Sequence, residues 1–217
     1  MSTSPSAAPL PWASVDSVFL DMDGTLLDLH FDNHFWLEYL PRRYGEARGL
    51  DPAQARSELM ARYAGVRGTL DWYCLDYWRQ ELDMDIIALK REMAHLIAVH
   101  EHVPDFLAAV RRLGRRLVLV TNAHRGGLDL KLTLTTLEGH FHRVVCAHEL
   151  GRPKEDPRFW DCLQGREPFD PRRTLFVDDN LDVLRSAERH GIAHLRAAEV
   201  DTGEFAAIRD FRDLMPE

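Results

Sequence analysis

The chain has 217 residues, of which 45% are hydrophobic, and its 27 basic and 35 acidic residues give a formal net charge of -8. This length allows one large domain or two small ones. The sequence contains no run of the ~18 to 20 apolar residues that a membrane span needs. Its basic residues are mixed with acidic ones and form no stripe. We therefore expect neither a membrane nor polymeric nucleic acid as a partner.

The N-terminal stretch, residues 1–13, is predicted to be flexible. It is rich in Ser, Ala and Pro, and it lacks the basic start and the apolar segment of a signal peptide. The three cysteines, Cys74, Cys146 and Cys162, are odd in number and widely spaced, which predicts neither a disulfide framework nor a zinc site. We expect a cytoplasmic protein.

The first predicted element is a buried strand near residues 15–21, and two carboxylates stand at its end. Asp21 and Asp23 are two positions apart, so in an extended segment both side chains point to the same side. Gly24 and Thr25 follow as a turn, in which glycine lets the backbone approach an anion. Two carboxylates that face one pocket suit covalent phosphoryl transfer, because one can attack while the other moves a proton.

A long insertion separates this motif from the next predicted strand. Ordinary connections have ~2 to 6 residues, whereas here the whole stretch 29–99 intervenes and has a helical pattern. Helix starts are predicted at Asp51-Pro52 and at Asp71. We therefore predict a helical cap domain at 29–99, inserted into a core domain that consists of residues 14–28 and 100–217.

The cap is expected to determine the substrate, because the motifs at the strand ends would contact only phosphate and metal. Its most unusual stretch carries four aromatic residues close together, namely Trp72, Tyr73, Tyr77 and Trp78. These rings cannot all lie on one helical face. We expect some of them, with Trp72 and Tyr73 as candidates, to line the cleft and stack on a nucleobase. The alternative is that they pack in the cap's own small core.

Four further strands are predicted after the insertion, near residues 116–121, 143–147, 174–178 and 192–196. They alternate with predicted helices, which indicates an α/β fold with a doubly wound parallel sheet. Thr121 and Asn122 stand at the end of the first of these strands, and Asp178 and Asp179 close the third. Lys154 lies between them in a proline-rich loop, where it offers a point charge for phosphate.

The crowding of acidic groups predicts a metal ion. Asp21, Asp23, Asp178 and Asp179 would share one pocket with a phosphate dianion, and such a concentration of negative charge requires a cation. Magnesium prefers oxygen ligands, which Asp21, Asp178 and the main-chain carbonyl of Asp23 could provide. Asp179 is expected to orient a water molecule or Lys154.

The polar motifs resemble, in order and in residue type, those of the haloacid dehalogenase-like (HAD) superfamily of phosphohydrolases. The matching motifs are Asp21-x-Asp23-Gly24-Thr25, Thr121-Asn122, Lys154 and Asp178-Asp179. The resemblance covers nearly the whole chain. It implies that Asp21 is the nucleophile and Asp23 the general acid and base.

The same resemblance implies that Thr121, Asn122 and Lys154 bind the phosphoryl oxygens, while the late acidic pair holds magnesium. The dehalogenase branch of the superfamily lacks the second Asp, and the ion-pump branch usually has Thr in its place. Asp23 therefore favours phosphate hydrolysis.

Two stretches of the cap, residues 29–36 and 68–78, resemble the bacterial GMP/IMP nucleotidase branch of the superfamily. That branch implies hydrolysis of purine 5'-nucleoside monophosphates, whereas the catalytic motifs alone imply only a phosphomonoester. Lys154 is followed by Glu155 where many relatives have proline, a departure that changes no catalytic assignment.

The sequence thus predicts a magnesium-dependent phosphomonoesterase that acts through an aspartyl-phosphate, most simply on GMP and IMP. A phosphatase for another small ester, such as phosphoglycolate or a sugar phosphate, stays open, as does a phosphomutase, which would return the phosphoryl group to its substrate. A phosphonate hydrolase would need an imine-forming cap lysine, and Lys90, in a buried helical pattern, shows no sign of that role. A non-catalytic phospho-ligand sensor would not need Asp21 and Asp23. The oligomeric state is not predicted.

Overall fold

A parallel six-stranded sheet organises the core of the molecule, which a computed structural model describes for residues 10–198 and 203–216. The strand order is β3-β2-β1-β4-β5-β6. The strands are β1 Ser17–Leu20, β2 Arg116–Thr121, β3 Arg143–Cys146, β4 Thr174–Asp178, β5 His194–Ala198 and β6 Ala207–Ile208. The predicted α/β class with a doubly wound parallel sheet is confirmed. The last strand is shifted by two residues from its predicted place, and the short β6 was not predicted.

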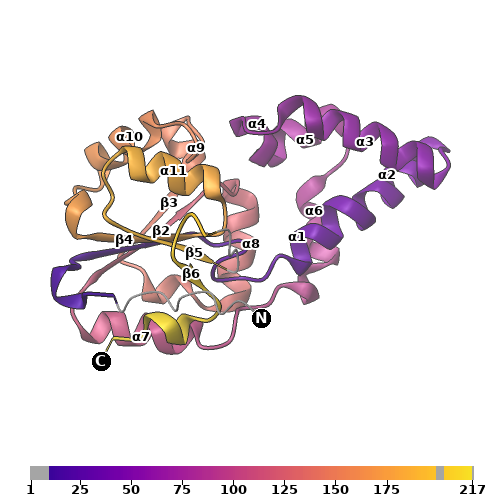
Figure 1. The fold of residues 1–217 in the computed structure, drawn as a ribbon. Helices are drawn as coiled ribbons and strands as arrows, with labels where there is room; N and C mark the ends of the chain where they lie inside the picture. Colours follow the sequence, from indigo (N-terminus) through magenta and orange to yellow (C-terminus); the bar gives the residue numbers. More distant parts are fainter. Residues whose placement is uncertain (1–9, 199–202, 217) are drawn as a thin grey trace.

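Helices cover both faces of the sheet (Figure 1). The core helices are α7 Val103–Arg112, α8 Arg125–Thr135, α9 Ala147–Leu150, α10 Arg158–Arg166 and α11 Leu181–Arg189. Single 3-10 turns lie at Trp12–Ser14, Glu138–His140, Pro171–Arg173 and Phe211–Leu214. Successive side chains of a strand point to opposite faces, so Phe19 packs with α10 and α11 on one face while Val18 and Leu20 pack with α7 and α8 on the other.

A separate lobe of helices is inserted between β1 and α7, at the upper right of Figure 1. Its helices are α1 His30–His34, α2 Leu40–Arg48, α3 Pro52–Val66, α4 Leu70–Tyr73, α5 Leu75–Leu82 and α6 Ile86–Glu92, with a π-helical turn at Phe35–Tyr39 and a 3-10 turn at Ala94–Leu96. Asp51 caps α3, as expected, by accepting from the amides of Ala53 and Gln54. Twelve buried residues form a core that belongs to this lobe alone.

The two chain segments that join the lobes run side by side. Leu27 and Val99 form an antiparallel bridge, and the amide of His100 donates to the carbonyl of Leu26 at 3.0 Å. This pairing keeps the entry and exit of the insertion together, close to the predicted limits of the cap. The division at 29–99 stays a prediction.

The predicted flexible N-terminus falls mostly on residues 1–9, which lie outside the described residues. Of the remainder, Leu10 is buried and the ring of Trp12 lies 6.2 Å from that of Phe106. Packing against the core therefore begins near residue 10, earlier than residue 14, because these two apolar side chains join the core cluster that includes α7. Within the described chain, no helix has the length and hydrophobicity to cross a membrane.

Candidate active site

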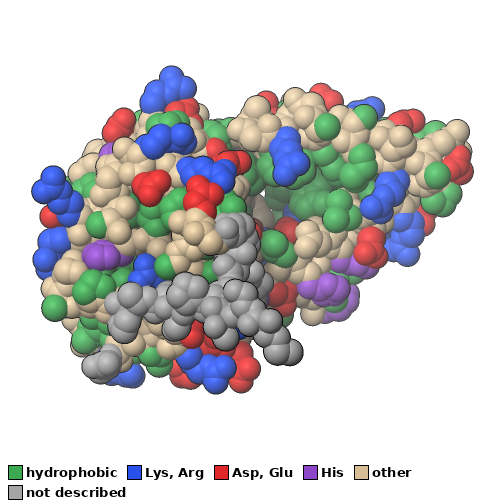
Figure 2. Space-filling model, viewed as in Figure 1, with side chains coloured by type: hydrophobic (Ala, Val, Ile, Leu, Met, Phe, Trp, Pro, Cys, Tyr) green, Lys and Arg blue, Asp and Glu red, His purple; other side chains and the backbone are tan. Residues whose placement is uncertain are grey.

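The carboxyl ends of β1, β2 and β4 meet at one edge of the sheet and bring the sequence motifs together. Val18 pairs with Leu117 and with Leu175, so β1 lies between its two neighbours and Asp21 follows it at the centre. A cavity of about 270 Å³ lies over this edge and continues beneath the cap. Figure 2 shows the hollow between the two lobes, with hydrophobic side chains gathered on the cap beside it. Ligands of doubly wound sheets bind at such an edge.

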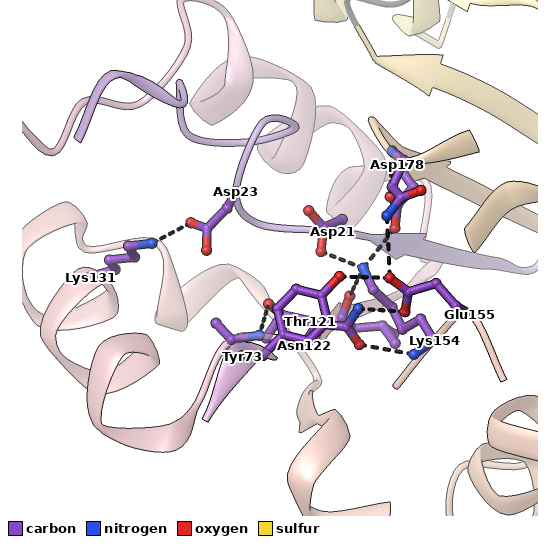
Figure 3. Close-up of polar contacts among 12 residues, drawn as sticks. Asp21, Asp23, Tyr73, Thr121, Asn122, Lys131, Lys154, Glu155 and Asp178 are labelled. Atoms are coloured by element: carbon purple, nitrogen blue, oxygen red, sulfur yellow. Dashed lines mark hydrogen bonds and ion pairs between the residues drawn. The ribbon is translucent and has the colours of Figure 1, made fainter. Parts of the chain in front are cut away.

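Lys154 joins three of the motifs at the base of the cavity (Figure 3). Its ammonium group donates to the carboxylates of Asp21 and Asp178 and to the carbonyl of Val120, at 3.1 Å in the last case. Burial alone would lower the pKa of Lys154, but the two carboxylates raise it. All three ammonium protons therefore have acceptors, and the lysine stays charged while only 2% exposed.

Asp21 and Asp23 both line the cavity, as their spacing predicts. Burial raises the pKa of Asp21 to about 7; Lys154 opposes this rise, and the neighbouring carboxylates of Asp178 and Asp23 add to it. Burial likewise raises the pKa of Asp23, which accepts a hydrogen bond from Lys131 at 2.7 Å. The two carboxylates thus have different partners. Asp21 is paired with Lys154 at the base of the cavity, and Asp23 is paired with Lys131.

Three carboxylates form a group that could hold a metal ion. Oxygen atoms of Asp21, Asp178 and Asp179 all lie within 4.8 Å of one another. Burial raises the pKa of Asp178 to about 6 and that of Asp179 to about 7, with repulsion between neighbouring carboxylates adding to the effect. Lys154 is the one ammonium group in contact with this trio among the described residues. The residues fit magnesium, because the donors are all hard oxygens and their negative charge is incompletely balanced.

Asp179 lies beside the other two carboxylates, and its expected role of orienting a water molecule or Lys154 stays a prediction. The tight turn after β1 leaves room for this carboxylate. Gly24 has a φ of +81°, and a Cβ atom there would come within 2.4 Å of the Asp179 carboxylate. Glycine at this position therefore allows the first motif to approach the last one closely.

Asn122 supports the lysine loop with its side chain. Its Oδ1 accepts from the amide of Lys154 at 2.9 Å, and its Nδ2 donates to Glu155 at 2.9 Å. The hydroxyl of Thr121 accepts from the amide of Ala123 at 3.0 Å. The side chain of Asn122 is therefore engaged with the protein, and the main-chain amides here are the groups that could donate to a phosphoryl oxygen.

The sequence patterns did not identify Lys131 and Asp32 as residues of the site. Lys131 in α8 donates to Asp23 and, at 2.5 Å, to Asp32 in α1, which also accepts from Lys90 at 2.7 Å. A signal was present, because Lys131 stands beside Leu128 and Leu132 on the apolar side of its helix, where a lysine needs a partner. The identity of that partner, about a hundred residues away along the chain, was not encoded locally.

Glu155 connects the cap to the catalytic loops, a role not foreseen from its place after Lys154. Its carboxylate accepts from the hydroxyl of Tyr73 at 2.6 Å, from Asn122, and from Asn180 at 3.3 Å (Figure 3). Proline at this position, as in many relatives, could make none of these hydrogen bonds. The departure from the family pattern therefore has a structural consequence here.

The aromatic run of the cap both lines the cavity and packs within the cap. Trp72, Tyr73 and Trp78 line the cavity, joined by Trp36 and Tyr63, whereas Tyr77 does not. The ring of Tyr63 stands edge-on to Trp72 at 5.7 Å and to Trp78 at 5.1 Å. We call the five rings that line the cavity the aromatic wall; they are Trp36, Tyr63, Trp72, Tyr73 and Trp78. The run therefore lines the cavity and also packs within the cap, and stacking on a nucleobase stays a prediction.

Comparison with known proteins agrees with this geometry. The family model "haloacid dehalogenase-like hydrolase" matches residues 15–191. The chain is 38% identical over 215 residues to the GMP/IMP nucleotidase YrfG of Escherichia coli K12, which covers 95% of this chain and 97% of that protein.

Two solved structures share the fold. A HAD phosphatase from Thermococcus onnurineus superposes with a TM-score of 0.80 at 22% identity, over 92% of this chain and 95% of that one. A HAD family enzyme from Bacteroides thetaiotaomicron, solved in complex with magnesium and inorganic phosphate, has a TM-score of 0.61 at 14% identity, over 86% of this chain and 95% of that one. The family match and the identity over almost the full length leave one conclusion: this chain is an enzyme of the haloacid dehalogenase-like hydrolase family, a phosphohydrolase.

Proposed function

We propose that this phosphohydrolase is a magnesium-dependent 5'-nucleotidase that cleaves GMP and IMP through an aspartyl-phosphate intermediate. The observation that carries the proposal is the placement of two differently supported carboxylates in one cavity. Asp21 is held by Lys154 at the base, and Asp23 is held by Lys131 on the side of the cap. A nucleophile and a proton carrier need this separation, because one must stay ionised while the other exchanges a proton.

In the first step a carboxylate oxygen of Asp21 attacks phosphorus as the bond to the ester oxygen breaks. The proton of the Asp23 carboxyl group passes to the departing oxygen, which leaves as the nucleoside hydroxyl. The raised pKa of Asp23 favours the protonated form that this step needs. Lys154 and the main-chain amides after β2 stabilise negative charge on the phosphoryl oxygens.

In the second step the Asp23 carboxylate takes a proton from a water molecule that attacks phosphorus. The bond between phosphorus and Asp21 breaks, phosphate leaves, and both carboxyl groups return to their starting states. Magnesium held by Asp21, Asp178 and Asp179 would supply positive charge that offsets the phosphate and the acidic trio. The main-chain carbonyl of Asp23 stays a predicted further ligand.

The nucleotide assignment is supported by the cap and by similarity. The aromatic wall offers Trp72 for stacking on a base, and the relative at 38% identity is named a GMP/IMP nucleotidase. The volume of the cavity, about 270 Å³, is just below the ~300 to 1,000 Å³ typical of small-molecule sites. More generally, the substrate is a small phosphate ester. A cytoplasmic location stays a prediction.

The rival reactions are less well supported by the charges of the cavity. A phosphomutase handles a bisphosphate and needs cations for a second phosphate, yet Lys90 and Lys131 are already balanced by Asp32 and Asp23. An imine-forming lysine must be free to attack a carbonyl group, whereas Lys90 is held in an ion pair at 2.7 Å.

A panel of phosphomonoesters assayed for free phosphate in the presence of magnesium tests the proposal. We expect GMP and IMP to give the highest kcat/KM, above AMP and well above glucose 6-phosphate and phosphoglycolate. A clear preference for phosphoglycolate or a hexose phosphate would reject the nucleotidase assignment and leave the phosphatase chemistry standing. Isomerised sugar phosphate with little free phosphate would instead identify a mutase.

A further inference from the structure

All the lysines of this chain lie in one cavity. The sequence contains 27 basic residues, and only Lys90, Lys131 and Lys154 among them are lysines. Each of the three is 2% or 3% exposed, and each lines the cavity beneath the cap. The surface positive charge is carried by arginine, so the lysine positions are restricted to this site. An ammonium group is a compact charge with three donors that can rotate toward different acceptors.

The three ammonium groups differ in how many of their protons are used. Lys154 donates to three acceptors, and Lys131 donates to two, Asp23 and Asp32. Lys90 donates to Asp32 alone among the described residues. Its other two protons have no oxygen or nitrogen acceptor among the described residues, where only aromatic ring faces lie near the ammonium group. A bound ligand with an acceptor atom would satisfy them.

The surroundings of Lys90 indicate what kind of ligand would bind there. Its ammonium nitrogen lies 4.7, 4.6 and 5.3 Å from the ring centres of Phe31, Phe35 and Trp36. Burial lowers the pKa of Lys90, and the carboxylate of Asp32 opposes that effect. With Lys131 and Asp23 included, this end of the cavity has two positive and two negative groups. A neutral, flat, polar group suits it better than a second phosphate.

The order of these groups follows the order of parts in a nucleotide. Asp23 would lie beside the ester oxygen, Lys131 is bonded to Asp23, and Lys90 is reached next through Asp32. Lys90 is therefore the last charged group of this series, separated from Asp23 by Lys131 and Asp32. The base is likewise the part of a nucleoside monophosphate farthest from its phosphate, with the ribose between them.

We propose that Lys90 and Asp32 together recognise the 6-oxo edge of the purine base. The ammonium group of Lys90 donates to O6, and the carboxylate of Asp32, which has acceptor capacity beyond its two lysines, accepts from N1–H. The assignment rests on the proposed nucleotidase function. AMP reverses both partners, because its 6-amino group would face the ammonium donor and its unprotonated N1 would face the carboxylate. Buried donors and acceptors left unpaired in this way reject the wrong substrate.

The test combines a deletion in the protein with a deletion in the substrate. Purine riboside 5'-monophosphate has neither the 6-oxo group nor a proton on N1, so it lacks the proposed partners of both Lys90 and Asp32 and keeps the ring system and the phosphate. Lys90→Met removes the donor, and Asp32 keeps Lys131 as its partner. Arg91→Met, at the exposed neighbouring position of α6, is the matched control. Hydrolysis of p-nitrophenyl phosphate measures the phosphatase chemistry of each protein independently of any base.

The readout is the ratio of kcat/KM for IMP to that for purine riboside 5'-monophosphate. We expect this ratio to be roughly ten to a hundred in the parent and in Arg91→Met, and to fall about tenfold in Lys90→Met, where only the contact of Asp32 with N1–H still separates the two substrates. An unchanged ratio in Lys90→Met would overturn the assignment while leaving the nucleotidase function intact. If the parent hydrolyses p-nitrophenyl phosphate but no purine nucleotide, the proposed function and this inference both fail.

A binding measurement covers the case in which Lys90→Met does not fold. Since the chain has only three lysines, protein labelled with 15N at lysine gives three side-chain ammonium signals. Lys90→Arg identifies the signal of Lys90 by its disappearance. We expect saturating inosine, which carries no phosphate, to shift that signal and adenosine to leave it in place. Saturation with inosine without any shift of the Lys90 signal would overturn the proposal.

Discussion

The hydroxyl of Tyr73 donates a hydrogen bond to Oε1 of Glu155 at 2.6 Å, and this contact joins α4 of the cap to the loop that carries Lys154. Because Glu155 also accepts from Asn122, a contact made by the cap reaches the residues that orient the lysine. The position of α4 and the arrangement of the catalytic loop are therefore linked through one carboxylate.

Replacing Tyr73 by Phe should lower kcat/KM for GMP by about two- to tenfold, the range expected for loss of one hydrogen bond of ~0.5 to 1.5 kcal/mol. Tyr77→Phe is the matched control, because Tyr77 lies on the same stretch but away from the cavity. Combining Tyr73→Phe with Glu155→Gln should cost less than the sum of the two single changes. Fully additive losses would show that the two residues act independently.

Asp21→Asn should reduce turnover by at least ~10³-fold, because a neutral amide cannot form the aspartyl-phosphate. The fold should survive, since Lys154 keeps Asp178 and the carbonyl of Val120 as acceptors. Phosphate release and the thermal unfolding midpoint are the two measurements, with Asp161→Asn on the exposed side of α10 as the control. Substantial activity in a folded Asp21→Asn protein would exclude covalent catalysis by this residue.

Removal of divalent metal with EDTA should abolish phosphate release, and added magnesium should restore it. The reason is that Asp21, Asp178 and Asp179 offer only carboxylate oxygens within 4.8 Å of one another. Asp179→Asn should raise the magnesium concentration needed for half-maximal activity, because it removes one negative charge from the site. Restoration by zinc alone would mean that the preference of the site for hard cations has been misjudged.

Trp72→Ala should lower kcat/KM for GMP by about ten- to a hundredfold, which corresponds to the ~1 to 3 kcal/mol of one base–aromatic stack. Hydrolysis of p-nitrophenyl phosphate provides the comparison, because loss of stacking on the base cannot affect that substrate. Trp72 also supports the edge-on contact with Tyr63, so the unfolding midpoint should be measured in parallel. Behaviour like that of the parent with GMP would assign Trp72 to the packing of the cap.

His148 should make the protein less stable as the pH falls from about 6.5 to about 4. Burial lowers the pKa of this imidazole to about 4 in the folded state, from its ordinary value of about 6.5. Between these values the unfolded chain binds more protons than the folded one, so the free energy of unfolding falls with decreasing pH. Below about 4 both states are protonated and no further loss arises from this group.

Denaturant midpoints at several pH values between 7.5 and 4 would measure that effect. His148→Asn should show a smaller decrease over this range than the parent, and the exposed His95→Asn should decrease as the parent does. A parallel decrease in His148→Asn and the parent would show that other groups determine the acid sensitivity.

The sequence by itself determined the parallel sheet and the base of the site. Asp21, Thr121 and Asp178 stand at the carboxyl ends of apolar strands, and parallel strands must bring those ends to the same edge. Local information was sufficient because strand formation and side-chain direction depend on neighbouring residues. The order of the motifs and the helical insertion followed from the same patterns.

Only the tertiary structure decided which residues surround the strand ends at the bottom of the cavity. The pairing of Lys131 with Asp23 and Asp32, and of Lys90 with Asp32, joins three separate segments of the chain. A lysine on an apolar helix face signals that some partner exists, but the packing of the cap against the core selects which one. Such contacts are not encoded by local periodicity, because they depend on the distance and angle between elements that are remote in the sequence.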